Sequence, residues 1–465
     1  MGFALTVLYF INCYLTPVTL FGPLARYRIE LILAILLLLI SAPRMMRSFV
    51  FRTPQALALA GLAVAVFSSV LVGAHWPGGA VNAFVGFIPN IYAYFILCLH
   101  CNSRRKLYVV VLMMLLVCLF VIANGAIDLH RGLPAGGPPV SVSTGAADIG
   151  LWNLEHPYVL AMKDDAGEWF YRLRGLGEIN DPNDFGQLLI CVIPLLFIFW
   201  RRKKRLFNIA FVILPCCLLQ YGIYLTHSRG ALVALVAVVL VAARRRIGAV
   251  PAAIVAGLLF AGAMALHFTG GRAISAGAGA DRTELWGESL QILKSYPVFG
   301  IGYAHLSEYI GHTAHNSVVV CAVELGLFGL FFWSLFLLST VRSSLLIASP
   351  KNVHDARNPE AEDGLLYFRT WKGTALGKTD INRLGFCLTL SLTGFLAAGW
   401  FLSRATVMTF FLLGGLSEIV YETARRQGMV SSRLPLAKSL IYSAALTVSL
   451  VAVVYVMLRI VNLMH

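Results

Sequence analysis

The sequence predicts an all-α integral membrane protein, with about 12–13 transmembrane helices and a long outward loop that contains interfacial helices. Hydrophobic residues make up 58% of the 465 residues and charged residues only 13%. A soluble domain has about 25% charged residues. The mean hydropathy is +0.78. Apolar runs also alternate with short basic clusters, which is typical of a chain that crosses a bilayer repeatedly.

A helix needs about 20 apolar residues to cross roughly 30 Å of hydrocarbon. By this measure we expect helices near residues 3–24, 29–43, 56–74, 80–99, 107–127, 186–200, 206–226, 230–243, 248–269, 316–341, 385–403, 405–421 and 437–461. The first run has neither a basic n-region nor a small-residue cleavage site, so we expect a retained helix and not a signal peptide.

The basic residues predict the orientation of these helices, because positive charge is enriched on the cytoplasmic side. They gather at every second connection, in 44–52, 104–106, 201–205, 244–246, 342–384 and 425–433. The alternate connections, 75–79, 128–185, 226–229, 270–315 and 403–404, then face outward. The N-terminus is expected inside.

The same pattern divides the chain into successive segments. We expect N-terminal transmembrane helices over 1–127, a first outward segment over 128–185, central transmembrane helices over 186–269, a main outward loop over 270–315, a transmembrane helix over 316–341, a cytoplasmic loop over 342–384 and C-terminal transmembrane helices over 385–465. The cytoplasmic loop is polar and is interpreted as mobile or as a simple connector.

The net charge of +15 does not indicate nucleic-acid binding, because the basic residues lie in short clusters between apolar runs. The nine cysteines lie mostly inside apolar runs and predict no disulfide framework. The partner that this composition implies is the phospholipid membrane.

The first outward segment begins with a loose glycine- and proline-rich stretch over 131–148 and then tightens around an arginine pair. Asp181 or Asn183 is expected to cap the helix that follows. Arg172 and Arg174 just before that helix form a candidate anion site. The alternative is an aromatic and basic anchor at the membrane interface.

Arg229 lies in the very short outward connection 226–230, between two spanning helices. An arginine is costly there unless it pairs or snorkels, and an outward arginine runs against the positive-inside bias. Both points favour an anionic ligand, with snorkelling to phospholipid headgroups as the alternative.

The stretch 281–324 combines an amphipathic pattern, a turn and three histidines. Asp281 and Glu284 have the spacing of a capping box, with Arg282 in the first turn. Leu285, Trp286, Ile292 and Leu293 fall on or near one face and Glu288, Gln291 and Lys294 mostly on the other, so we expect an interfacial helix that stops at Tyr296 and Pro297. Gly300 to Gly302 is expected to form a tight turn.

The spacing of His305, His312 and His315 could place all three near one helical face, where three histidines could bind zinc. No carboxylate or cysteine pattern supports that site, so we expect no metal. His315 lies directly before Asn316 and the next spanning run, at the outer mouth of that helix. Glu324 lies deeper in the same run and is interpreted as a functional carboxylate or, alternatively, as a helix–helix hydrogen bond.

These residues suit one kind of chemistry. Arginines hold phosphate by paired hydrogen bonds, and a histidine can take a proton from a hydroxyl near neutral pH. Together they indicate transfer from a lipid-linked phosphate or pyrophosphate donor to a hydroxyl acceptor. The outward loops show neither a glycosidase-like carboxylate pair nor a DxD-like metal site, so no cofactor is expected.

Four segments resemble the O-antigen ligase and O-antigen polymerase superfamily of bacterial membrane enzymes. They are RLRGLGEINDPNDF, THSRGALVAL, DRTELW with YPVFGIG, and AHNSVVVCAVELGLFG, and they span roughly residues 165–345. The resemblance implies a GT-C-like fold in the bacterial inner membrane with its active face periplasmic. It implies inverting, metal-independent transfer of a glycan from undecaprenyl pyrophosphate to an acceptor hydroxyl.

The resemblance also implies roles for individual residues. His315 would be the catalytic base, and Arg229, Arg282 and Arg174 would bind the donor pyrophosphate. Asn183, Asn316, Arg172 and Glu324 would be supporting. A lipid A core acceptor is favoured over the alternatives, which are polymerisation of lipid-linked repeat units and glycan ligation to protein.

Two hypotheses from other functional classes stay open. A transporter or flippase of a lipid-linked glycan would put polar residues at mid-membrane in broken helices, often in repeats. Here the polar residues lie at the outer ends and no internal repeat is visible. A non-catalytic assembly partner would tolerate alanine at the arginines.

Overall fold

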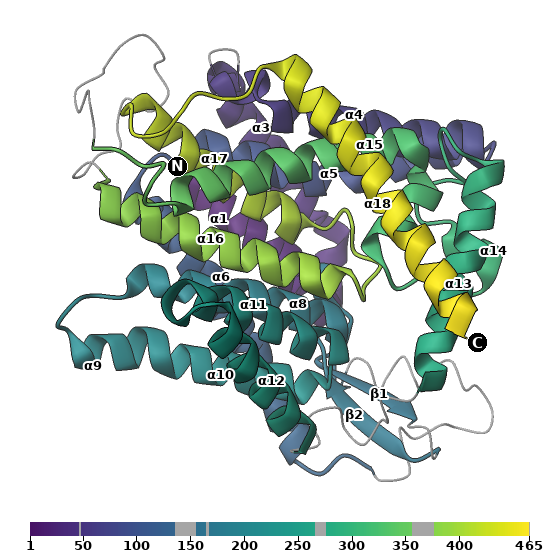
Figure 1. The fold of residues 1–465 in the computed structure, drawn as a ribbon, viewed down its shortest axis with the longest axis horizontal. Coiled ribbons are helices and arrows are strands. Elements are labelled where there is room, and N and C mark those ends of the chain that lie inside the picture. The colour runs from purple at the N-terminus through teal and green to yellow at the C-terminus, as the bar shows by residue number, and fades with distance from the viewer. Residues whose placement is uncertain (46–47, 135–154, 164–166, 266–275, 356–375, 465) are drawn as a thin grey trace. The chain divides into compact units, whose positions relative to one another are not determined.

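The computed structural model describes residues 1–45, 48–134, 155–163, 167–265, 276–355 and 376–464. Its regular structure in these ranges is helical apart from one two-stranded sheet (Figure 1), which confirms the all-α class. Parts of two predictions, the loose stretch near 131–148 and the mobile centre of 342–384, lie outside the described residues.

Eight of the described helical stretches are long and apolar enough to cross a membrane. They are Pro54–Gly73, Pro77–His100, Arg104–His130, Pro182–Phe199, Arg205–Thr226, Ser317–Ala348, Lys378–Gly399 and Leu436–Val461. The other expected runs also form helices, but these are shorter or carry more charged residues. The fold is therefore that of an integral membrane protein.

The expected continuous helix over 3–24 is wrong. Helix α1 (Gly2–Leu15) ends where Thr16 takes a left-handed conformation with φ 39°, and the short helix α2 (Pro17–Leu20) begins after it. Proline lacks a backbone N–H and is favoured at the first turn of a helix and not in its interior. Pro17 therefore starts a new helix instead of extending the first.

The chain divides into two compact units. Unit 1 comprises 1–43, 103–273 and 390–398, and unit 2 comprises 44–102, 274–389 and 399–465.

Unit 1 is built around a group of apolar helices. Helix α8 (Pro182–Leu195) packs against α10 (Leu214–Thr226) and α11 (Arg229–Ile247), and α11 packs against α12 (Ala249–Ala265), as the teal ribbons of Figure 1 show. The other elements are η1 (Gly22–Tyr27), α3 (Ile29–Met45), α6 (Arg104–His130), η4 (Gly177–Ile179), η5 (Leu196–Phe199), α9 (Arg205–Asn208) and η6 (Ile209–Ile213).

A β-hairpin that the sequence reasoning did not predict also belongs to unit 1. Strands β1 (Val159–Lys163) and β2 (Trp169–Leu173) are antiparallel, with Val159 opposite Leu173. Both strands pack against α6, and β2 also contacts α10. The hairpin fixes the position of the arginines at its end.

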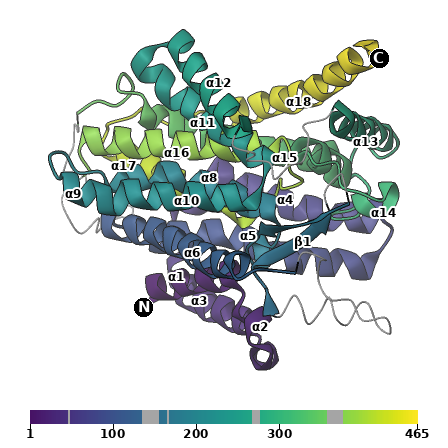
Figure 2. The same ribbon diagram turned by 90° about the horizontal axis from the view of Figure 1, so that it is seen from below.

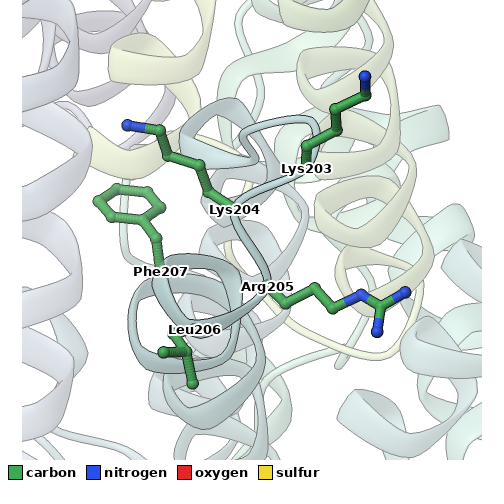
Figure 3. A pocket seen from close by; sticks show the side chains of 5 residues that line it. All are labelled: Lys203, Lys204, Arg205, Leu206 and Phe207. Carbon is green, nitrogen blue, oxygen red and sulfur yellow. The ribbon is translucent and has the colours of Figure 1, made fainter.

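The basic connection between α8 and α10 lines an open pocket in unit 1 (Figure 3). Lys203, Lys204 and Arg205 contribute the cations, and Figure 3 shows their side chains spread in different directions. The Arg201 guanidinium stacks on the Phe207 ring at 4.1 Å from its centroid. Because the cations do not converge on one point, this surface resembles a solvated basic face more than a phosphate site.

Unit 2 is organised around the long helix α15 (Ser317–Ala348), which packs against α4 (Pro54–Ser68), α17 (Met408–Arg426) and α18 (Leu436–Met464), as Figure 2 shows for α4 and α18. A Cβ on Gly61 of α4 would lie 2.2 Å from the Phe332 ring of α15, so only glycine permits this approach. Small residues at helix contacts are typical of membrane bundles. The other elements are η2 (Phe49–Arg52), η3 (Ser69–Gly73), α5 (Pro77–His100), α13 (Ala276–Ser295), α14 (Leu306–Ile310) and most of α16 (Lys378–Gly399).

Candidate functional site

In unit 1, Arg172 ties the β-hairpin to the end of α10 and the start of α8. Its side chain is 2% exposed. Its Nε donates to the Thr226 carbonyl oxygen at 2.8 Å, at the end of α10, and its Nη2 donates to Asn183 Oδ1 at 3.0 Å. A buried guanidinium with these partners acts mainly as a structural tie.

The N-terminal end of α8 is capped as expected. Asp181 Oδ1 accepts a hydrogen bond from the Asn183 backbone N–H at 2.7 Å, which confirms Asp181 as the cap. The Asn183 side chain is turned instead to Arg172. Asn183 therefore joins the hairpin to the helix start.

Arg174 follows β2 and is half-buried beside the hairpin. Its Nε donates to the Pro157 carbonyl oxygen at 3.1 Å, and its backbone N–H donates to the Tyr158 carbonyl oxygen. Burial lowers the pKa of the Arg174 guanidinium, and the charge of Asp181 partly opposes that shift. An arginine still keeps its proton at any physiological pH.

Arg229 is the first residue of α11, after a sharp turn. His227 lies in the left-handed region with φ 46°, and the Ser228 hydroxyl caps the helix by accepting from the Ala231 N–H at 3.3 Å. A Cβ on Gly186 of α8 would lie 2.9 Å from the Ala231 Cβ, so the first turns of α8 and α11 are in close contact. The half-buried Arg229 therefore lies beside two helix N-termini, which favour anions.

In unit 2, α15 is interrupted at Gly326, which has φ 67° and ψ −176°. The segment 297–302 runs beside this break and satisfies its backbone groups. Ile301 and Gly302 donate to the carbonyl oxygens of Val323 and Glu324 at 3.0 and 3.1 Å, and Leu327 donates to the Pro297 carbonyl oxygen at 2.9 Å. The two sequence motifs YPVFGIG and AHNSVVVCAVELGLFG thus form one paired structure.

The Glu324 side chain completes this pairing. Its Oε2 accepts from the Ala304 N–H at 3.0 Å and its Oε1 accepts from the Leu306 N–H at 3.3 Å, at the start of α14. The carboxylate is 8% exposed. Glu324 therefore holds the segment that leads to His315, and neither of these contacts is a bond between the side chains of two spanning helices.

The expected capping box at Asp281 is wrong, because α13 begins at Ala276 and Asp281 lies inside the helix. Alanine favours helix, so the preceding AGAGA stretch extends it upstream. The amphipathic pattern is confirmed: Trp286 and Leu293 are buried, whereas Glu288, Gln291 and Lys294 are exposed. The helix ends at Ser295, next to the expected stop at Tyr296.

Helix α13 contacts the residues around His315 through Trp286 and Arg282. The Trp286 indole Nε1 donates to the Ala314 carbonyl oxygen at 2.7 Å, and the Trp286 ring meets the Trp400 ring edge-on at 6.0 Å. The Arg282 guanidinium lies 5.9 Å from the centroid of the Phe401 ring. Arg282 and the residue before His315 are therefore both anchored by this helix.

His315 lies at the start of α15 with its side chain exposed. Its φ is 48°, and its backbone N–H donates to Ser403 Oγ at 3.0 Å. Asn316 caps α15 by accepting from the N–H groups of Val318 and Val319, and its Nδ2 donates to the Trp400 carbonyl oxygen at 3.2 Å. The placement of His315 at the mouth of this helix is thus fixed by its neighbours.

The three histidines do not share a helical face. Helix α14 covers only Leu306–Ile310 and ends at Gly311, which has φ 71°. His305 Nδ1 is hydrogen-bonded to the Tyr303 carbonyl oxygen at 2.7 Å. Within the described ranges, the structure has no group of three or more His, Cys, Asp or Glu side chains that could hold a metal ion.

The structure brings the predicted site residues together in two sets, one in each unit. Unit 1 holds Arg172, Arg174, Asn183 and Arg229, and unit 2 holds Arg282, His315, Asn316 and Glu324. Sequence reasoning missed the β-hairpin and the contacts of the segment 400–404. The polar break WFLSRAT within an apolar stretch was the available signal for the second of these.

The helices define a multi-pass membrane protein, and the two residue sets place Arg229 and His315 at the starts of helices. Residues 214–334 match the family model described as O-antigen ligase, which confirms the resemblance to the O-antigen ligase and polymerase superfamily. The matched range includes Arg229, Arg282, His315, Asn316 and Glu324, whereas Arg172, Arg174 and Asn183 precede it. The comparison with curated proteins finds no match. The family match implies a membrane enzyme of the glycan-transferring ligase type.

Proposed function

We propose that this protein transfers a glycan from undecaprenyl pyrophosphate to an acceptor hydroxyl at the periplasmic face of the bacterial inner membrane. The observation that carries the proposal is the placement of His315: its ring is exposed at the start of α15, and Arg282 lies in the same unit beside the segment that holds it. The match to O-antigen ligase covers both residues.

His315 serves as the base in this reaction. The acceptor oxygen attacks the anomeric carbon, its proton passes to an imidazole nitrogen of His315, and the bond from that carbon to the phosphate oxygen breaks. Undecaprenyl pyrophosphate leaves, and the sugar configuration inverts.

The arginines stabilise the charge that develops on the leaving pyrophosphate. Arg229 lies at the N-terminal end of α11, where the helix dipole also favours an anion. We assign the same role to Arg174 in unit 1 and to Arg282 in unit 2, because guanidinium groups supply the positive charge in this chemistry. Asn183 and Arg172 support the arginines of unit 1 by joining the β-hairpin to α8 and to Thr226, three residues before Arg229. Asn316 and Glu324 support His315 through the contacts described above.

The favoured acceptor is the lipid A core. The experiment is a reaction of the purified, reconstituted protein with a lipid-linked glycan and one acceptor at a time: lipid A core, a second lipid-linked glycan, or a serine-containing peptide. Product with the core lipid alone supports a ligase, whereas product with the second lipid-linked glycan shows a polymerase and product with the peptide a protein ligase.

The residue test compares His315→Ala with His312→Ala, because His312 is also exposed and only three residues away. We expect His315→Ala to lose at least about a hundredfold in turnover, the scale of general-base catalysis, and His312→Ala to keep it. Normal turnover by His315→Ala would refute the catalytic role.

A transport assay distinguishes the proposed glycan transfer from the flippase alternative. The break in α15 does not by itself favour transport, because the carbonyl oxygens of Val323 and Glu324 at the break are bonded to the 297–302 segment. Movement of lipid-linked glycan across liposomes without a new glycosidic bond would overturn the proposed function. So would unchanged turnover when Arg229 and Arg282 are both replaced by alanine, which is the result expected of a non-catalytic partner.

A further inference from the structure

The backbone of His315 is held in a conformation that few residues adopt. Its φ of 48° lies in the left-handed region, which residues other than glycine rarely occupy. Such a conformation persists only where the surrounding structure holds it, and strained residues of this kind cluster at functional sites. The contacts that hold His315 therefore bear on its role.

The segment 400–404 holds the start of α15 through four hydrogen bonds. The Ser317 hydroxyl donates to the Leu402 carbonyl oxygen at 2.7 Å and accepts from the Arg404 N–H at 3.0 Å. Asn316 donates to the Trp400 carbonyl oxygen. The Ser403 hydroxyl oxygen reaches His315 itself, accepting from its backbone N–H at 3.0 Å.

We infer that Ser403 is a positioning residue for His315, which fixes the backbone from which the imidazole reaches the acceptor. This inference rests on the proposed role of His315 as the base. A general base must lie about 2.6–3.2 Å from the group whose proton it takes, and a displacement of about 1 Å can reduce the rate by about a hundredfold. Without the Ser403 hydroxyl, the His315 backbone loses an acceptor that holds it in the left-handed region.

The test measures kcat, KM and the melting temperature of the full-length, reconstituted protein with Ser403→Ala, Ser403→Thr and His315→Ala. Ser443→Ala is the control, because it removes another hydroxyl that is hydrogen-bonded to backbone within the same unit; the Ser443 hydroxyl donates to the Phe331 carbonyl oxygen at 2.8 Å. We expect Ser403→Ala to lower kcat about tenfold with KM unchanged. Ser403→Thr keeps the hydroxyl acceptor and should restore kcat.

Three outcomes would overturn the inference, and they are distinguishable. Wild-type kcat in Ser403→Ala, with His315→Ala inactive, removes the positioning role and leaves the proposed function intact. Equal losses of kcat and melting temperature in Ser403→Ala and Ser443→Ala show a general stabilising role instead. Full activity of His315→Ala refutes the proposed role of His315 as the base, and it also refutes the positioning role of Ser403.

Discussion

The carbonyl oxygen of Val298 occupies the place of a side chain at Gly326: a Cβ built there would lie 2.1 Å from that oxygen. The same oxygen accepts a hydrogen bond from the Phe328 N–H at 3.1 Å. Gly300, in the segment beside the break, is also in close contact with backbone, since its Cβ would lie 2.4 Å from the Val323 carbonyl oxygen. The break in α15 and the segment beside it therefore depend on glycine at both positions.

We expect Gly326→Ala to destabilise the folded protein by about 3 kcal/mol or more, because its backbone conformation is one that only glycine adopts readily and the added Cβ collides with backbone. The apparent melting temperature in detergent measures this change. Gly86→Ala is the control, because no atom lies within 4 Å of a Cβ at that position in α5. Similar melting temperatures for both variants would contradict the glycine requirement.

The two hydrogen bonds that the Glu324 carboxylate accepts predict a graded loss of stability in a substitution series. Glu324→Ala leaves the N–H groups of Ala304 and Leu306 without these acceptors, at a cost of about 1–3 kcal/mol each. Glu324→Gln keeps one acceptor oxygen and should lose less. Thermal unfolding checks the expected order of stability, wild type above glutamine above alanine. A glutamine variant as unstable as the alanine variant would argue against the paired acceptor role.

Arg172→Lys keeps the charge but loses the planar fork that reaches both the Thr226 carbonyl oxygen and Asn183 Oδ1. We expect a loss of about 1–3 kcal/mol in stability. Arg205→Lys, at an exposed position in the same unit, should change little. Thermal unfolding of the two variants side by side provides the measurement, and equal stability would contradict the role of Arg172 as a tie.

The donor-site arginines are tested by inhibition with inorganic pyrophosphate, the anion that the lipid donor carries. Hydrogen bonds to charged groups contribute about 1.5–3 kcal/mol each, so Arg229→Ala and Arg282→Ala should each weaken this inhibition by about 10- to 100-fold. Arg205→Ala should leave it unchanged. Unaltered inhibition constants in both donor-site variants would exclude these arginines from the pyrophosphate site.

The helices were predictable because apolar composition and length are local properties of the sequence. The run 107–127 lies inside α6, and the run 437–461 lies inside α18. The boundaries of other helices were harder to place. Proline ended the first helix early at Thr16, and the glycine- and alanine-rich stretch before Asp281 carried α13 upstream past the expected cap.

The contacts of the candidate site residues were only partly predictable. The cap at Asp181 uses neighbouring residues, so its spacing reveals it. The hydrogen bond between His315 and Ser403 joins residues 88 positions apart, and no local sequence pattern indicates it. The role of Glu324 was left open between chemistry and structure because its partners, Ala304 and Leu306, offer backbone groups that any residue has.

The sequence by itself determined that the chain is a helical membrane protein, and that Arg229 and His315 lie where helices begin. Both follow from hydropathy and charge, which each residue carries wherever it lies. Only the tertiary structure decided that Arg172 is a buried tie, that Glu324 holds backbone N–H groups, and that His315 is kept in a left-handed conformation. Those facts depend on hydrogen bonds between segments far apart in the chain, and they exist only once those segments are packed together.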